Sequence, residues 1–306
     1  MADDDGQQYA DADVVRLPAV FCIFGIMKYP IGIQDFRKLR EGGFVYVDKT
    51  PQIYQLLQGS KYFFLSRPRR FGKSLLLSTL KEIYTGSKTL FEGLWIDSRW
   101  DWERMQRPVV WLRFASFQYK SQPLREAIWQ GVLLEAERLG IELDDKPESN
   151  PLSSLLRKTH QKYNRKVVLL IDEYDKPIID YLDGTEVAER NRDILKWLYS
   201  GLKDSDPYLE LVFITGVSAF SKVSIFSDLN NLYNLSLSPL AKNLNGITQE
   251  EIEADFQQPL QSIAEEQGLS YTALLEEIRK WYNGYSWTKG ERVYNPFSLL
   301  NFLQTR

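Results

Sequence analysis

Cysteine and histidine are nearly absent from this chain of 306 residues, which contains one of each, Cys22 and His160. A single cysteine excludes an intrachain disulfide, so a reducing cytoplasm is the simplest compartment. A single histidine excludes metal sites built from several histidines, and it leaves a histidine-based catalytic triad only one candidate. Because His160 lies in a polar, basic stretch, we expect it at the solvated surface.

Long apolar runs and a strong net charge are lacking as well. The apolar run at 19–26 is much too short to span a bilayer, and the acidic residues before it do not fit a signal peptide. A net charge of −3 gives no field that would attract nucleic acid or an anionic membrane. We expect residues 1–13 to be disordered, and the apolar run could be an extra strand. Residues 1–26 as a whole are predicted to be disordered or an appended, non-native leader.

The stretch 62–77, YFFLSRPRRFGKSLLL, has the order of a phosphate-binding loop. Its first four residues predict a buried strand, a turn follows, and the leucines from Leu75 onward start a helix. Backbone N–H groups of such a loop face the phosphates of a nucleotide. Lys73 would then reach the β- and γ-phosphates, and the Ser74 hydroxyl would ligate Mg²⁺.

This loop departs from the usual pattern at one position. The pattern G-x-x-x-x-G-K-[ST] places a glycine five residues before Gly72, and this chain has Arg67 there. The alternative is an ordinary loop that leads into a helix.

A second motif supports the first. Residues 167–171 are five consecutive apolar residues, typical of a strand buried on both faces, and Asp172 and Glu173 follow at its carboxyl end. Ligands of open parallel sheets bind at that end. Asp172 could hold Mg²⁺, and Glu173 could polarise the attacking water. A core strand that ends in a solvated acidic turn is the alternative, but the two motifs together predict a nucleoside-triphosphate site.

Three arginines, Arg67, Arg69 and Arg70, lie within the loop. Guanidinium groups match phosphate oxygens, so one of them could stabilise the γ-phosphate, in cis or across an oligomer interface. We favour Arg70 because it is nearest to the glycine. The alternative is that they form ion pairs with Asp172, Glu173 or Asp175.

The strand predicted at 209–216 ends in a polar residue, Thr215, which we expect to sense the γ-phosphate. Ser218 and Ser221 are alternatives, and so is a strand that merely ends in polar residues.

The tryptophans of 95–102 resemble a packing patch. Two further strands are predicted at 108–114 and 231–237, the latter being the fifth strand of the sheet. Helices are predicted at 123–139, 151–163 and 186–203. A helical pattern also runs from Thr248, where a capping box marks its start, to Gly268, and again from Tyr271 to Tyr282.

Five motifs occur from Met27 onward: Tyr-Pro-Ile-Gly at 29–32, YVDKT at 46–50, RPRRFGKS at 67–74, LIDEYDKP at 170–177 and FITGVS at 213–218. In these motifs the chain closely resembles the AAA-ATPase-like proteins of bacteria and archaea. That family also lacks the first glycine of the loop. The resemblance implies ATP rather than GTP, and makes Tyr46 and Asp48 candidates for contact with the base, although a core tyrosine and a helix cap are equally compatible with the pattern. Such proteins usually continue into a restriction-endonuclease-like domain, before which this sequence stops.

These observations predict a three-layer α/β P-loop NTPase of the glutamate-carrying division, with a mainly parallel sheet of about five strands. The core would span 27–240, and 241–306 would form a helical lid. We expect Mg²⁺-dependent ATP binding and hydrolysis; the alternatives are a slow nucleotide-dependent switch for a protein partner or a second copy, and an inactive remnant. The predicted phosphate-binding residues are Arg67, Pro68, Arg69, Arg70, Phe71, Gly72, Lys73, Ser74 and Leu75.

Overall fold

A computed structural model describes residues 27–143, 150–218, 225–226, 231–288 and 292–305 of the chain. Within these residues, five parallel strands form one sheet in the order β2-β3-β4-β1-β5. The strands are β1 Tyr62–Ser66, β2 Val109–Arg113, β3 Val167–Asp172, β4 Leu209–Gly216 and β5 Tyr233–Asn234. The predicted parallel α/β architecture is therefore confirmed.

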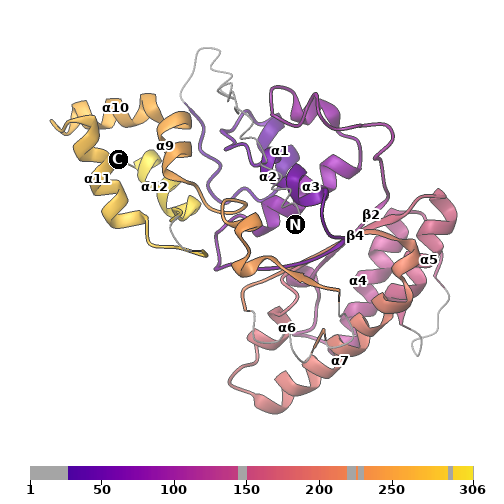
Figure 1. The fold of residues 1–306 in the computed structure, drawn as a ribbon. Helices are drawn as coiled ribbons and strands as arrows, with labels where there is room; N and C mark the ends of the chain where they lie inside the picture. Colours follow the sequence, from indigo (N-terminus) through magenta and orange to yellow (C-terminus); the bar gives the residue numbers. More distant parts are fainter. Residues whose placement is uncertain (1–26, 144–149, 219–224, 227–230, 289–291, 306) are drawn as a thin grey trace, which may run out of the picture.

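Helices cover both faces of the sheet because successive strand residues point to opposite sides. Tyr62 and Phe64 of β1 pack in one core with α4, α5 and α7, whereas Phe63 and Leu65 pack in a second core with α1, α2 and α3. The two groups of helices lie on opposite sides of the sheet (Figure 1). The helices are α1 Phe36–Glu41, α2 Thr50–Leu57, α3 Lys73–Tyr84, α4 Leu124–Arg138, α5 Pro151–Tyr163, α6 Lys176–Ile179 and α7 Thr185–Asp204.

The C-terminal helices gather beside the sheet and have a core of their own (Figure 1). They are α9 Gln249–Asp255, α10 Gln257–Glu266, α11 Tyr271–Tyr282 and α12 Pro296–Thr305. The capping box predicted at Thr248 is present, with Glu251 as its partner. Tyr29, Val45 and Val47 from the start of the chain also pack against this core. The C-terminal helices are thus joined to the segment that precedes the phosphate loop.

One local prediction was wrong. The fifth strand is only Tyr233–Asn234, because the Asn234 side chain accepts a hydrogen bond from the Ser236 backbone N–H (3.1 Å) and starts the 3₁₀ turn Leu235–Leu237. A 3₁₀ helix, Lys88–Phe91, follows α3. The prediction that the tryptophans of 95–102 pack is confirmed, since Trp100 and Trp102 are buried. Residues 1–26 and Ser221 lie outside the described residues.

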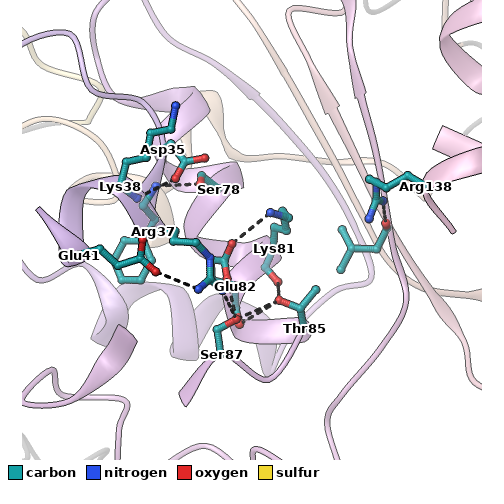
Figure 2. A network of polar contacts seen from close by, with 12 residues as sticks. Asp35, Arg37, Lys38, Glu41, Ser78, Lys81, Glu82, Thr85, Ser87 and Arg138 are labelled. Carbon is teal, nitrogen blue, oxygen red and sulfur yellow. Dashed lines mark hydrogen bonds and ion pairs between the residues drawn. The ribbon is translucent and has the colours of Figure 1, made fainter. Parts of the chain in front are cut away.

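Polar contacts attach α1 to the helix that follows the phosphate loop (Figure 2). The Phe36 backbone N–H donates to the Ser78 hydroxyl over 2.9 Å, and Arg37 donates to the buried carboxylate of Glu82 over 2.7 Å. The Ser87 hydroxyl donates to the same carboxylate over 2.6 Å. Because charged, hydrogen-bonded groups hold these helices together, the segment 30–35 that leads into α1 is fixed relative to α3.

A buried ion pair joins the start of the chain to the C-terminal helices. Lys49 Nζ lies 2.6 Å from a carboxylate oxygen of Glu251, and the two side chains are 11% and 2% exposed. We expect Lys49→Met to lower the free energy of unfolding by about 3 kcal/mol, because it leaves a buried carboxylate without its counter-charge. Urea unfolding would measure the change.

The exposed pair Arg37–Glu41, with side chains 45% and 58% exposed, provides the control. Glu41→Gln is expected to cost less than about 1 kcal/mol, since solvent screens such pairs. Equal costs for the two variants would contradict the role assigned to Lys49.

Every helix within the described residues falls short of the length and apolar character that crossing a bilayer requires.

Candidate functional site

The phosphate loop leaves β1 at Ser66 and enters α3 at Lys73 through a left-handed turn. Gly72, at the N-cap of α3, has a φ of 76°, a conformation that glycine adopts without the cost that a side chain would bring. The backbone of Arg70, two residues before Gly72, is also left-handed, with a φ of 70°. No side chain caps the N-terminus of α3, whose first N–H groups are therefore able to bind an anion.

Lys73 is buried under this loop, and its ammonium donates to two loop carbonyls. The distances from Nζ are 2.8 Å to the Arg67 oxygen and 2.9 Å to the Pro68 oxygen. Burial lowers the pKa of Lys73, and the charges of Asp172 and Glu173 act in the opposite direction. The ammonium is thus held inside the loop.

Asp172 and Thr215 lie at the carboxyl ends of neighbouring strands. The register pairs Ile171 with Ile214, which brings the next residue of β3 beside the next residue of β4. The buried Thr215 hydroxyl donates to Asp172 Oδ1 over 2.7 Å. The residue predicted as a sensor is therefore bonded to the residue predicted as a metal ligand.

Glu173 has a left-handed backbone, with a φ of 54°, which is uncommon outside glycine and clusters at functional sites. Burial raises the pKa of its carboxyl, as does the neighbouring charge of Asp172, whereas Lys176 and Lys73 lower it. A half-buried carboxyl whose pKa is raised has the character of a general base.

A cavity of about 310 Å³ brings the predicted groups together. Lys73, Ser74 and Glu173 line it from the sheet side, and Pro296, Phe297 and Leu300 line it from the C-terminal helices. The remaining lining residues are Pro30, Ile31, Gly32, Ile33, Gln34, Arg69, Arg70, Gly72 and Leu75. Its floor is cationic and rich in N–H groups, which suits a phosphate chain.

A neighbouring cavity of about 580 Å³ includes Asp172 and shares Ser74 with the first. A serine hydroxyl and a carboxylate supply the hard oxygen ligands that Mg²⁺ takes. Within the described residues no cluster of three or more acidic, cysteine or histidine side chains could hold a metal by itself. The donor set therefore fits an ion that is completed by phosphate oxygens and water, as Mg²⁺ is in nucleotide sites.

The three loop arginines have different surroundings. The side chain of Arg67 is buried, and its guanidinium donates to the carbonyls of Ser236 (2.7 Å) and Ala241 (3.1 Å). Arg69 and Arg70 are exposed and line the phosphate cavity. The ion pairs from these arginines to Asp172, Glu173 or Asp175, weighed from the sequence, are absent from the described part of the chain.

Aromatic residues of the C-terminal region contact the loop. The Arg70 guanidinium lies 4.0 Å from the ring centre of Phe297, and that of Arg67 lies 4.3 Å from Trp287. Phe71 is buried against Tyr285 and Trp287, with ring centres 4.6 and 5.5 Å apart. These aromatic side chains therefore cover the loop.

The sequence analysis assigned no functional role to two buried polar residues near the site. Asp175 Oδ2 accepts hydrogen bonds from the backbone N–H groups of Val217 (3.0 Å) and Ser218 (2.7 Å), and from the Ser218 hydroxyl (2.6 Å). Ser218, an alternative sensor, is thereby bonded to a neighbouring turn. Asn245 donates to the Phe71 carbonyl over 3.1 Å. Asp175 lies in the LIDEYDKP motif, whereas no local signal marks Asn245.

The resemblance implied that Tyr46 and Asp48 contact the base. For Asp48 the structure shows contacts within the protein instead. Asp48 accepts hydrogen bonds from the backbone N–H groups of Thr50 (2.8 Å) and Trp95 (2.7 Å), so it ties the start of α2 to the segment that contains Trp95. Tyr46 is buried and lines an apolar pocket of about 100 Å³ beside the phosphate cavity.

Comparison with known proteins agrees with this geometry. A family described as Predicted AAA-ATPase, AAA-ATPase_like, matches residues 30–226. The chain is 43% identical over 281 residues to a protein of Azotobacter chroococcum mcd 1 described as an uncharacterized protein in the vnfD 5' region. That match covers 91% of this chain and 52% of the relative, so the chain spans about half of the relative's length. No solved structure matches significantly.

Proposed function

The chain belongs to the family of predicted AAA-ATPases, and we propose that it binds ATP with Mg²⁺ and hydrolyses it. One observation carries the proposal: Lys73, Ser74 and Glu173 line one cavity at the carboxyl edge of a parallel sheet. Ligands of open α/β sheets bind at that edge. The site thus has a cation, a hydroxyl ligand and a carboxylate base where a triphosphate would lie.

Each group would have a defined task. The N–H groups at the start of α3 and the Lys73 ammonium would hold the phosphate oxygens, with Arg70 or Arg69 at the open side. Ser74 and Asp172 would hold Mg²⁺, which when bound neutralises charge on the β- and γ-phosphates. Glu173 would orient a water and accept its proton as the water attacks the γ-phosphorus.

Thr215 would link the γ-phosphate to the metal ligand, since its hydroxyl already donates to Asp172 over 2.7 Å. The strand order also supports the assignment of Glu173, because β4 lies between β1 and β3. A strand inserted between the lysine-bearing and acid-bearing strands is the arrangement expected for the glutamate-carrying division of P-loop proteins.

A second candidate function is a switch that binds ATP, changes shape and turns over slowly without a partner. The contacts of Arg67 and Arg70 with Trp287 and Phe297 favour it, because they connect the loop directly to the C-terminal region. Residues 241–306 would then act as a lid that follows the state of the nucleotide. A protein partner or a second copy of the chain would respond to this change of shape. We place this interaction in the cytoplasm.

Steady-state phosphate release from ATP, together with equilibrium ATP binding, tests the proposal. We expect the purified chain to hydrolyse ATP with Mg²⁺ and to lose this activity when EDTA removes the metal, because Mg²⁺ neutralises the phosphates. Tight binding without hydrolysis would support the switch. A chain that neither binds nor hydrolyses ATP would overturn both functions.

A further inference from the structure

The apolar pocket of about 100 Å³ lies directly against the phosphate cavity, and both are lined by Gly72 and Leu75. Its walls come from distant parts of the chain: 45–47 before the phosphate loop, Leu75 and Leu76 on α3, and 244–247 before α9. A molecule that fills both cavities would carry phosphates at one end and a flat apolar group at the other. A nucleotide has this form, so the inference rests on the proposed function.

One polar group in this pocket is left without a partner. Asn245 is only 4% exposed, and its side-chain Oδ1 is buried with no donor among the described residues. Two of the other polar side chains that line the pocket are paired: Thr79 with the Leu75 carbonyl, and Lys49 with Glu251. A buried acceptor without a donor costs free energy unless a ligand supplies one.

The orientation of the Asn245 amide follows from its other contact. Its Nδ2 donates to the Phe71 carbonyl over 3.1 Å, and a carbonyl can only accept. Turning the amide over would place two oxygens against each other. The oxygen therefore faces away from the loop carbonyl, and Asn245 is one of the residues that line the pocket.

We propose that this pocket takes the base of the nucleotide and that Asn245 selects adenine by accepting a hydrogen bond from its exocyclic amine. Adenine carries an N–H donor at its 6-position, whereas guanine and hypoxanthine carry a carbonyl acceptor there. A carbonyl facing Asn245 Oδ1 would leave two buried acceptors unpaired. Sites built to accept a donor reject analogues that lack it.

Three nucleotides that differ at the 6-position test the proposal on the wild-type chain. ATP has an amine there, purine riboside triphosphate has hydrogen, and ITP has a carbonyl together with a hydrogen on the adjacent N1. We expect equilibrium binding to weaken in that order, with ATP at least about tenfold tighter than ITP. Equal binding of ATP and ITP would overturn the role of Asn245 and leave the proposed function standing. If none of the three nucleotides binds, the proposed function fails first.

Asn245→Leu separates base selection from support of the loop. Loss of the bond to the Phe71 carbonyl would weaken ATP and ITP alike, whereas loss of Oδ1 reduces the ratio of their affinities to within about threefold. Gln52→Met is the matched control, because Gln52 Oε1 is also buried without a partner but does not line the pocket. The ratio of ATP affinity to ITP affinity in Gln52→Met should equal that of the wild type. A wild-type ratio in Asn245→Leu would also overturn the proposal.

Discussion

Replacing Glu173 by glutamine is expected to reduce ATP hydrolysis by at least about 100-fold and to leave ATP binding with Mg²⁺ within about threefold of wild type. Glutamine has the shape of glutamate but cannot accept the proton of the attacking water. The left-handed backbone at this position, with a φ of 54°, costs glutamate and glutamine about the same conformational free energy. Phosphate release and equilibrium binding on the same preparation would measure the two effects separately.

Glu189→Gln provides a matched control, since it makes the same chemical change at an exposed position on α7. Its turnover should equal that of the wild type. Substantial turnover by Glu173→Gln would show that another group activates the water.

The pH profile provides a second measurement of the same role. Burial raises the pKa of Glu173 above its ordinary value of 4.5, and the base must be ionised to accept a proton. The acid limb of kcat/KM, which reports the free enzyme, should therefore lie above pH 4.5. The residual activity of Glu173→Gln should lack this limb.

Several elements could be predicted to the residue because local sequence determines them. The strand at Leu209–Gly216 is an apolar run that is buried along almost its whole length. The helix Pro151–Tyr163 begins after Asn150, whose side chain accepts from the Leu152 N–H, with proline in its first turn. The helix Tyr271–Tyr282 begins after Ser270, a cap of the same kind. In each case the residues that predict the element lie within it or directly before it.

The partners of the loop arginines could not be predicted in this way. The carbonyls of Ser236 and Ala241 that bind Arg67 lie 169 and 174 residues further along the chain. Charge complementarity suggested acidic partners near the site, but backbone carbonyls and an aromatic face can also bind a guanidinium. Only the tertiary structure determines which of these partners it meets.

The same separation in sequence explains why the candidate site was only partly predicted. Lys73, Ser74, Asp172 and Glu173 lie on motifs whose strand-to-loop context is local, and they do lie around adjoining cavities. Asn245 and the aromatic residues that cover the loop come from segments with no motif chemistry of their own. Their positions depend on how the C-terminal helices pack against the start of the chain.

The second large effect is expected for Lys73→Ala, which should weaken ATP binding by about 100-fold. A charge-assisted hydrogen bond of this kind contributes roughly 1.5–3 kcal/mol, and 1.4 kcal/mol corresponds to tenfold in affinity. Because the ammonium would reach the β- and γ-phosphates, the loss should be large for ATP, smaller for ADP and absent for AMP. Titrations of the three nucleotides with wild type and variant would measure this gradient.

The gradient also separates a phosphate contact from a role in holding the loop. The Lys73 ammonium donates to the carbonyls of Arg67 and Pro68, so its removal frees two loop groups. If the loop simply rearranged, binding of AMP would fall together with that of ATP. Lys88→Ala, at an exposed lysine beyond the end of α3, controls for loss of positive charge and should bind all three nucleotides normally. An equal loss for ATP and AMP would contradict the assigned contact, because a side chain that binds the β- and γ-phosphates has no partner on AMP.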